Sequence, residues 1–481
     1  METGCSPWSA TQVRNELLRH ERHRWALSRI LFYMLNMLKR ILTLCAVAAV
    51  VHAQHTPVLL VSVDGLRPDY LLQADRYGLK IPHLRRMLAE GAHATGVHGV
   101  LPTVTYPSHA TLVTGVSPAR HGICANTTFD PEGRNYEGWY WYAADLQVPT
   151  LWDEARNAGL TTANMQWPVT AGAAIDFNVP QYWRAGTADD HKLLRLLSTP
   201  GLLELLEHDT ESLTDGADES IDGDQRRAKA AVRLLELKRP GFMTVYLASL
   251  DNVEHEHGPF SAEANATLEQ IDALIGRLRT AAGALTVVSV VSDHGFLKVD
   301  KEVHLLTAFR QHGLLDADEA GHVKSWQATA WFSGATAAIR INPQAPSGTQ
   351  ERVGGLLEEL VKDANSGLAR VLSGDEVKRL GGCQAAAFLV ELKPGFMFGS
   401  ETGGPLVTNS KLRGMHGYLA DRNEMNSTFL IAGPGVPAGQ TLGEIDMRDI
   451  APTLAGILGI RLSEAEGHDV LAREDHPGSA R

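Results

Sequence analysis

Three apolar runs of strand length set the hydrophobic pattern of the chain. Residues 57–63, 241–248 and 285–291 are rich in valine, leucine and other apolar residues, with little polar alternation. Such runs are typical of strands that are buried on both faces of a parallel sheet. Each run is followed closely by an aspartate, in chain order Asp64, Asp251 and Asp293. The pattern therefore predicts three buried strands with acidic residues at their carboxyl ends.

Segments with helical spacing accompany these strands. We expect helices at 81–91, 264–281 and 449–458. Strands that alternate with helices favour a parallel sheet that is covered on both faces. The sequence predicts an α/β fold with a mostly parallel central sheet flanked by helices. A chain of 481 residues is long enough for one such core and an insertion.

The pattern changes in the second half of the chain, where shorter strands surround one helix. The expected elements are two strand segments and a helix, at 329–341, 385–392 and 344–362. We predict a smaller α+β cap domain at 305–405. It is inserted into the catalytic core and divides that core into 54–304 and 406–481.

The N-terminal segment has the features of a signal peptide. Met37–Arg40 is a short basic start, Ile41–Val51 is an uncharged apolar run, and Ala53 offers a small-residue cleavage site. We therefore predict a signal peptide at 37–53, preceded by residues from an upstream start codon. The apolar run is too short to span a bilayer, so we expect no stable membrane span in the mature chain. An uncleaved anchor is the alternative to secretion or periplasmic export.

Charge argues against a nucleic-acid polymer as partner. Residues 1–53 hold seven Lys+Arg and three Asp+Glu, which leaves 37 basic and 53 acidic residues and a net charge of −16 after cleavage. An acidic protein does not attract polyanions through its general field. An anionic small-molecule substrate would need a local positive charge, for which bound metal ions are the obvious source.

Two cysteines, Cys124 and Cys383, remain after the signal segment is removed. An oxidising compartment permits a disulfide between them, but two free thiols are equally compatible with the sequence.

Histidines accompany the three aspartates in the sequence, and this combination indicates metal ligation. The carboxyl ends of strands are where open α/β sheets bind ligands, and three acids there repel one another unless a cation holds them. His294 directly follows Asp293, His255 lies four residues after Asp251, and His416 lies in a glycine-flanked loop. Each aspartate alone is more often a helix cap. Together, the mixed carboxylate and imidazole set suits zinc, and two such sets suggest two ions.

A nucleophile is expected beside these metals at Thr105. The stretch 101–115 contains Pro107, a residue suited to the first turn of a helix. Thr105 would then lie at the helix N-terminus, where the macrodipole and a cation both favour an alkoxide. Taken alone, a threonine in this place is usually a cap.

Together these residues resemble the nucleotide pyrophosphatase/phosphodiesterase (type I phosphodiesterase) family of the alkaline phosphatase superfamily. The resemblance extends over 57–470 and rests on six motifs in the family's order. In this chain the motifs are Val63-Asp64-Gly65, Thr105-Tyr106-Pro107-Ser108-His109 with Leu112-Val113-Thr114-Gly115, His121-Gly122-Ile123-Cys124-Ala125-Asn126, Asp251-Asn252-Val253-Glu254-His255-Glu256-His257-Gly258-Pro259, Ser292-Asp293-His294-Gly295-Phe296 and His416-Gly417-Tyr418.

The resemblance implies an alkaline-phosphatase-like core with two zinc ions per chain. The first zinc would be held by Asp64, Asp293, His294 and the Thr105 oxygen, and the second by Asp251, His255 and His416. Thr105 would attack phosphorus and form a phosphothreonine ester, which a water on the second zinc would cleave. Asn126 would donate to a non-bridging phosphoryl oxygen. His109 and His121 are expected to orient the Thr105 helix rather than to bind metal.

Departures from the family pattern concentrate near the substrate. Tyr106 replaces the usual Phe and is still able to stack on a substrate, and Ser108 replaces Asn. Glu254 replaces a Gly beside His255, and either adds a negative charge near the second metal or points to solvent. His257 is interpreted as a loop histidine.

The predicted activity is that of a secreted zinc phosphodiesterase or nucleotide pyrophosphatase acting on small-molecule phosphodiesters or nucleotides. Candidate substrate-binding residues are Tyr106, Asn126, Tyr182 and Trp183, although single aromatics are more often plain packing. A phosphonate-ester or phosphonoacetate hydrolase is the nearest alternative, followed by a phosphatase. A metal-bound binding module without turnover is disfavoured because Thr105 and every expected ligand are present.

Overall fold

The computed structural model describes residues 55–472 except 136–137, 184–186, 209–211, 215–217 and 384–385, together with isolated positions between 11 and 39. The described residues from His55 onward belong to one compact unit. Apart from Met37 and Lys39, the predicted signal peptide at 37–53 lies outside the described residues. Within the described part of the chain, no helix has the length and apolar character needed to cross a membrane.

An eight-stranded sheet forms the centre of this unit, and it is mostly parallel, as predicted. The strand order is β19-β2-β18-β7-β1-β6-β4-β5. These strands are β1 (Val58–Val63), β2 (Ala92–His93), β4 (Thr162–Met165), β5 (Phe177–Val179), β6 (Phe242–Leu247), β7 (Val287–Val291), β18 (Phe429–Ala432) and β19 (Gln440–Thr441). Strand β1 pairs in parallel with β6 and β7, whereas β18 runs antiparallel to β7 and to β2.

Both faces of the sheet are buried because successive side chains of β1 enter two different hydrophobic clusters. Leu59, Val61 and Val63 pack with α3 (Pro82–Glu90), α9 (Ile221–Lys238) and α11 (Ala262–Ala282). Val58 and Leu60 pack with α4 (Thr105–Thr114) and α15 (Ile450–Leu458). Alternating burial on both faces is what an apolar run without polar alternation requires. The predicted fold class is therefore confirmed.

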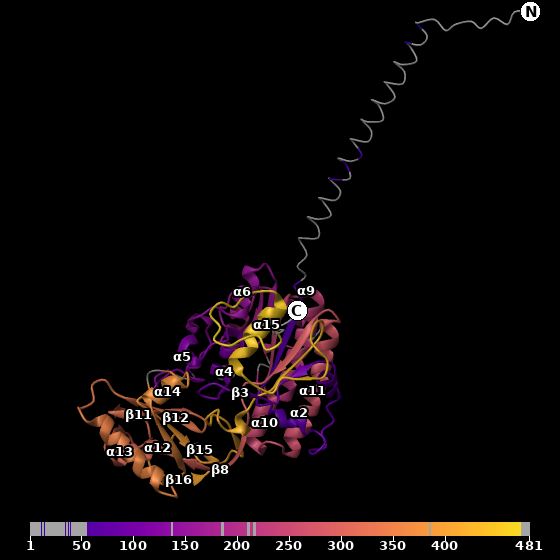
Figure 1. Cartoon of the computed structure of the whole chain (residues 1–481). Coiled ribbons are helices and arrows are strands. Elements are labelled where there is room, and N and C mark those ends of the chain that lie inside the picture. Colours follow the sequence, from indigo (N-terminus) through magenta and orange to yellow (C-terminus); the bar gives the residue numbers. More distant parts are fainter. Residues whose placement is uncertain are drawn as a thin grey trace, which may run out of the picture. The chain divides into compact units, whose positions relative to one another are not determined.

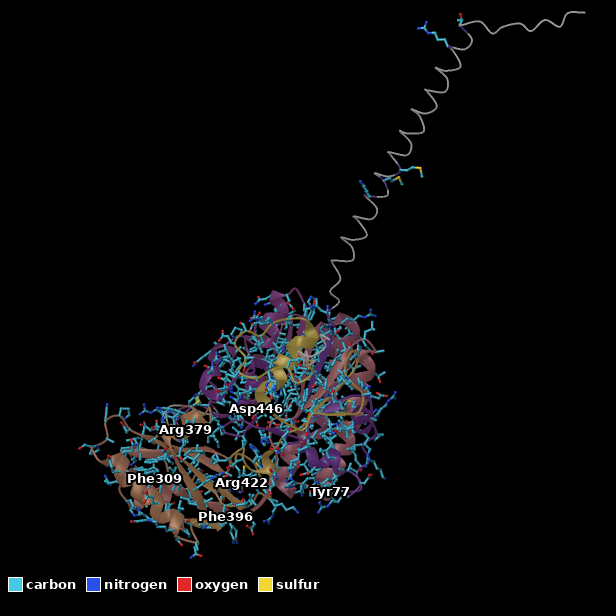
Figure 2. The ribbon with its side chains drawn as sticks, viewed as in Figure 1. Tyr77, Phe309, Arg379, Phe396, Arg422 and Asp446 are labelled. Carbon is cyan, nitrogen blue, oxygen red and sulfur yellow. A yellow bond between two sulfur atoms is a disulfide. The ribbon has the colours of Figure 1, made fainter. Side chains whose placement is uncertain are left out.

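Smaller sheets and helices follow in the part of the chain coloured orange in Figure 1. An antiparallel sheet has the order β11-β12-β14-β13, and α13 (Thr349–Lys362) packs on it around a separate hydrophobic cluster. Its strands are β11 (Ala328–Ser333), β12 (Thr336–Ile341), β13 (Leu368–Ser373) and β14 (Phe388–Leu392). Phe309 and Phe396 belong to this region, whereas Tyr77 lies in the part built on the large sheet (Figure 2).

A further sheet crosses both predicted boundaries of the inserted domain. Strand β8 (Leu297–Val303) pairs with β15 (Gly395–Phe398), β16 (Val407–Asn409) and β17 (Gly414–Met415). The segment that joins the core to the smaller sheets is thus itself hydrogen-bonded on both sides. The boundaries at 305 and 405 stay a prediction.

A disulfide and hydrogen bonds tie the two regions together. Cys124 and Cys383 form a disulfide across a sequence separation of 259, which decides between the two alternatives left by the sequence. The Trp331 indole donates to the Thr127 carbonyl at 3.1 Å. These ties anchor the loop after α5 to the smaller sheets.

Further elements complete the described fold. The helices are α2 (Pro68–Leu72), α5 (Pro118–His121), α6 (Leu151–Asn157), α7 (Ala188–Leu197), α8 (Leu202–Glu207), α10 (Ser249–His257), α12 (Leu305–Gln311) and α14 (Gly374–Arg379), and the strands are β3 (Gly96–His98), β9 (Leu315–Ala317), β10 (Val323–Trp326) and β20 (Glu444–Asp446).

Candidate active site

The three strand-end aspartates come from neighbouring strands of the large sheet. Asp64 directly follows β1, and its amide donates to the Leu247 carbonyl at the end of β6, at 2.9 Å. Asp251 lies in the first turn of α10, just after β6, and Asp293 lies two residues beyond β7. Because β7, β1 and β6 are adjacent and parallel, their carboxyl ends meet at one edge.

Two clusters of candidate metal ligands meet at this edge. Within each cluster the ligand atoms lie within 4.8 Å of one another, and the members are Asp64, Asp293 and His294 in one and Asp251, His294 and His416 in the other. His294 is common to both clusters, whereas the family resemblance implied separate sets. His255 lies at the edge of the second cluster, with its Nε2 3.4 Å from Asp251 Oδ2.

The three imidazoles are held by the same kind of contact, although the His255 ring is tilted 54° from that of His416. Each Nδ1 faces a backbone carbonyl oxygen, at 3.0 Å for His255, 3.3 Å for His294 and 3.3 Å for His416. Only a protonated Nδ1 can donate to a carbonyl, so the lone pair of each neutral ring is on Nε2. The Nε2 atoms lie toward the carboxylates: that of His294 is 3.1 Å from Asp293 Oδ2 and 3.3 Å from Asp64 Oδ1. Backbone acceptors of this kind hold metal-binding histidines in position.

Electrostatics favour a cation at the same place. Burial raises the pKa of Asp64, and the charges of Asp293 and Asp251 raise it further. Burial lowers the pKa of His255 to about 4, so this ring is neutral at physiological pH. Several buried carboxylate oxygens have no hydrogen-bond partner among the described residues: Asp64 Oδ1, Asp251 Oδ1 and Asp293 Oδ2. Unpaired buried acids are costly, and a divalent cation held by carboxylates and neutral imidazoles removes that cost.

Thr105 is the first residue of α4, with Pro107 in the first turn as the sequence predicted. Its Oγ1 lies 3.5 Å from His294 Nε2, and the residue is only 8% exposed. The Tyr106 amide donates to Asn126 Oδ1 at 2.9 Å. This bond fixes which end of the Asn126 amide faces the helix, and it leaves the NH₂ group as the end available to a ligand.

His109 and His121 form hydrogen bonds with α4, the helix that begins at Thr105. The His109 ring lies between the Thr105 carbonyl oxygen (2.8 Å) and the Ser62 hydroxyl (2.9 Å). His121 Nδ1 accepts from the Ile123 amide at 3.1 Å, so its Nε2 carries the proton and donates to Thr111 Oγ1 at 3.1 Å. Neither histidine belongs to the two ligand clusters.

A cavity of about 500 Å³ opens beside the clusters. Its lining residues are Asp64, Thr105, Tyr106, Asn126, Trp139, Trp141, Gln181, Trp183, Asp218, Glu219, Tyr246, Asp251, His255 and His416. Three of the four predicted substrate-binding residues line it. The fourth, Tyr182, packs against Trp141 with ring centroids 5.3 Å apart and is not among the lining residues.

Several lining residues were missed by the sequence analysis. The run Trp139-Tyr140-Trp141-Tyr142 was a usable signal, because four consecutive aromatic residues lie outside every predicted helix and strand. Tyr246, the next-to-last residue of β6, donates from its hydroxyl to Asp64 Oδ2, a contact that no spacing in the sequence predicts. Gln181, Asp218 and Glu219 carry no motif.

Glu254 does not point to solvent. It is fully buried, Tyr70 Oη donates to its Oε1 at 2.6 Å, and its Oε2 has no hydrogen-bond partner among the described residues. Burial raises the pKa of Asp251, and the charges of Glu219, Asp293 and then Glu254 raise it further. His257 is the last residue of α10 and not a loop residue as predicted; its side chain is 44% exposed and lies 3.7 Å from Glu256.

The fold and these clusters define an α/β protein with a candidate two-metal centre and a threonine at the strand ends of its sheet. Comparison with known proteins makes the assignment specific. The profile of the family "Type I phosphodiesterase / nucleotide pyrophosphatase" matches residues 58–419. The chain belongs to this family.

Curated relatives match only part of their length. Human ectonucleotide pyrophosphatase/phosphodiesterase family member 1 is 27% identical over 258 residues, which are 50% of this chain and 23% of that protein. The venom phosphodiesterase of Naja atra is 25% identical over 234 residues, or 46% of this chain and 23% of that protein. The chain thus spans about a quarter of the length of these relatives.

Solved structures share the fold over most of the chain. Human ectonucleotide pyrophosphatase/phosphodiesterase 5 superposes with a TM-score of 0.62 at 22% identity, covering 86% of this chain and 98% of that one. An inactive variant of the murine protein in complex with AMP gives a TM-score of 0.62, also at 22% identity, covering 86% of this chain and 99% of that one. At this identity the likeness supports the fold alone.

Proposed function

We propose that this chain is a metal-dependent phosphodiesterase that cleaves phosphodiester or pyrophosphate bonds of small molecules, including nucleotides, through a threonine ester. The observation that carries the proposal is the convergence of Thr105 and both ligand clusters on one cavity. Family membership and relatives named as phosphodiesterases support the same activity.

Zinc is the metal that the donors fit, with two ions per chain. Asp64, Asp293 and His294 would hold the first together with the Thr105 oxygen. Asp251, His255 and His416 would hold the second. When bound, the two ions would polarise the phosphoryl group and favour the ionised forms of the attacking and leaving oxygens.

Thr105 provides the nucleophile in this mechanism. Its Oγ1 forms a bond to phosphorus as the bond to one ester oxygen breaks, and the hydroxyl proton passes overall to the departing alcohol. A water then forms the next oxygen–phosphorus bond, the threonine ester breaks, and Thr105 regains a proton. The position at the start of α4 directs the helix dipole at the developing negative charge.

Asn126 and the buried histidines position these atoms. Asn126 is held through its Oδ1 and donates from its NH₂ group to a non-bridging phosphoryl oxygen. His109 fixes the first turn of α4 by its contact with the Thr105 carbonyl. Tyr106 and Trp183 contact the esterified group beside phosphorus.

Export to an extracytoplasmic space is part of the proposal. The predicted signal peptide at 37–53 with cleavage near Ala53 supports it. The disulfide between Cys124 and Cys383 suits an oxidising compartment. Similarity to venom phosphodiesterases agrees with secretion.

The test is kcat/KM of the zinc-loaded protein, starting at Gln54, on a nucleoside p-nitrophenyl phosphodiester and on p-nitrophenyl phosphate. We expect a strong preference for the diester. Thr105→Ala should lower turnover by at least about 10³-fold while zinc content is unchanged, whereas Thr105→Ser retains a hydroxyl and should keep part of the activity. Preference for the monoester would indicate a phosphatase, and full activity of Thr105→Ala would exclude the threonine ester.

A further inference from the structure

The loop after α5 carries Asn126, and the smaller region of the chain is linked to this loop on both sides of that residue. Cys124, two residues before Asn126, is joined by the disulfide to Cys383, and their Cα atoms are 5.7 Å apart. Directly after Asn126, the Thr127 carbonyl oxygen accepts the Trp331 indole N–H at 3.1 Å. The residue expected to contact the phosphoryl group therefore lies between two links to the smaller region.

The core holds the same loop through apolar side chains. Ile123 and Ala125 are buried, and Ile123 packs in the hydrophobic cluster that contains Tyr106. Cys124 lies between these two residues and is only partly buried. The disulfide thus adds a covalent link to the smaller region at a point where the core already contacts the residues on either side.

Asn126 itself is held by two backbone amides. Its Oδ1 accepts from the Tyr106 amide at 2.9 Å, and its carbonyl oxygen accepts from the Tyr140 amide at 3.1 Å. Asn126 and Tyr140 both lie outside the helices and named strands. A functional group on a loop is placed less precisely than one on a helix or strand unless surrounding contacts fix it. The links that flank Asn126 therefore bear directly on where its NH₂ group lies.

Cys383 is joined to a segment that the core fixes in place. The Ala119 amide, in α5, donates to the Gly381 carbonyl oxygen at 3.0 Å. Gly381 has a φ of +75°, and a Cβ at this position would lie 2.7 Å from Ser117 Cβ, so the close approach requires glycine. Cys383 follows two residues later. The disulfide consequently ties the Asn126 loop to an anchored point.

We propose that Cys383, through its disulfide with Cys124, is a positioning residue for Asn126 in phosphoryl transfer, and that Trp331 supports the same position. The inference rests on the role proposed above for Asn126 and assigns part of the reaction geometry to the smaller region. The disulfide contacts no reacting atom. It restricts the loop so that the Asn126 NH₂ group meets the phosphoryl oxygen, and a displacement of about 1 Å is enough to reduce a rate by up to about 10²-fold.

A disulfide that only stabilised the fold would behave differently. A cross-link restricts the unfolded chain, and its loss lowers the free energy of unfolding without acting through one particular side chain. A positioning effect, in contrast, requires Asn126 to be present. The two roles therefore separate in a double-mutant cycle between the disulfide and Asn126.

The cycle compares four zinc-loaded proteins on a nucleoside p-nitrophenyl phosphodiester. Cys124→Ser and Cys383→Ser are made together, which avoids a free thiol, with and without Asn126→Ala. We expect loss of the disulfide to lower kcat by about tenfold when Asn126 is present, while KM changes by less than about twofold. With Asn126→Ala, loss of the disulfide should change kcat by less than about twofold.

Each other outcome of the cycle has a definite meaning. An equal fall in kcat with and without Asn126 would show that the disulfide acts on the fold as a whole, and it would overturn the inference. An unchanged kcat in the serine variant, or two free thiols found by alkylation of the denatured unmodified protein, would overturn it as well. None of these results touches the phosphodiesterase proposal, which fails instead if the unmodified zinc-loaded protein does not hydrolyse the diester.

A second variant tests the inference with the disulfide intact. Trp331→Phe removes the N–H that donates to Thr127 but keeps an aromatic ring against Phe129, and kcat should fall by about threefold. Trp326→Phe is the matched control, because Trp326 also contacts Phe129, with ring centroids 5.8 Å apart, and it should change kcat by less than about twofold. Equal losses in the two variants would refute the role assigned to Trp331.

Discussion

The two walls of the cavity differ in how they are built. The metal wall consists mainly of residues at or just beyond the ends of β1, β6 and β7, adjacent strands whose hydrogen-bond register fixes their relative positions; His416, which follows β17, completes it. The other wall consists of Trp139, Trp141, Gln181, Asp218 and Glu219, which lie outside the helices and named strands. Rigid strand ends suit the invariable geometry of phosphoryl transfer, whereas loops can change with the substrate without disturbing the sheet.

Removing the metal ions should have the largest effect, because it disables the metal wall and leaves the other wall unchanged. Chelation should abolish turnover, and it should lower the melting temperature because bound ions stabilise only the folded state. Zinc should restore both. Turnover that survives in protein shown by elemental analysis to be metal-free would contradict the assignment of the two clusters.

Replacing Asn126 should have the next largest effect, since this residue lines the cavity and is hydrogen-bonded to the residue after Thr105. Asn126→Ala removes a donor to the phosphoryl oxygen, and kcat should fall by about 10²–10³-fold. Asn126→Asp keeps the bond from the Tyr106 amide but places a negative charge near phosphate, and should be at least as inactive. An unchanged kcat for both variants would remove Asn126 from the mechanism; steady-state kinetics with zinc content measured in parallel decides.

Tyr246 offers a smaller and more selective perturbation of the metal wall. Its hydroxyl donates to Asp64 Oδ2, so Tyr246→Phe should loosen that carboxylate and weaken zinc binding by about 10–100-fold. Competition with a chromophoric chelator measures the affinity. Tyr70→Phe is the matched control, because Tyr70 donates instead to Glu254, and it should affect zinc less.

The smallest effect is expected at His121, which links α4 to the loop that carries Asn126. Burial lowers the pKa of His121 to about 3, below the ordinary value of 6.5. Its contribution to stability is therefore fully present above pH 6.5 and is lost as pH falls toward the folded-state value. Between pH 6.5 and 5 the loss amounts to about 2 kcal/mol. His121→Gln retains a donor and an acceptor without titrating, so denaturant unfolding should show less pH dependence; an identical slope would argue against this linkage.

Recovery of the fold from sequence depended on the length of each apolar run. The helix predicted at 264–281 is α11 (Ala262–Ala282), and the three long strands lie within a residue or two of their expected bounds. By contrast, β18 is only four residues long and was not predicted, and β8 alternates polar and apolar residues because one of its faces is exposed. The predicted strand at 329–341 is a hairpin, since Gly334 adopts a left-handed turn between β11 and β12.

The sequence by itself determined the family and the candidate chemistry: the aspartates that follow the buried strands, the histidines at fixed spacing and Thr105 before its helix. These are local patterns, and the aspartates meet at one edge of the sheet because their strands are adjacent and parallel. Tertiary structure decided what local pattern does not encode. Packing against Tyr70 turned Glu254 inward, folding joined Cys124 to Cys383, and the loop before α9 brought Glu219 to the cavity that Tyr106 also lines. Contacts between residues distant in sequence depend on the packing of the whole chain, which no spacing along it records.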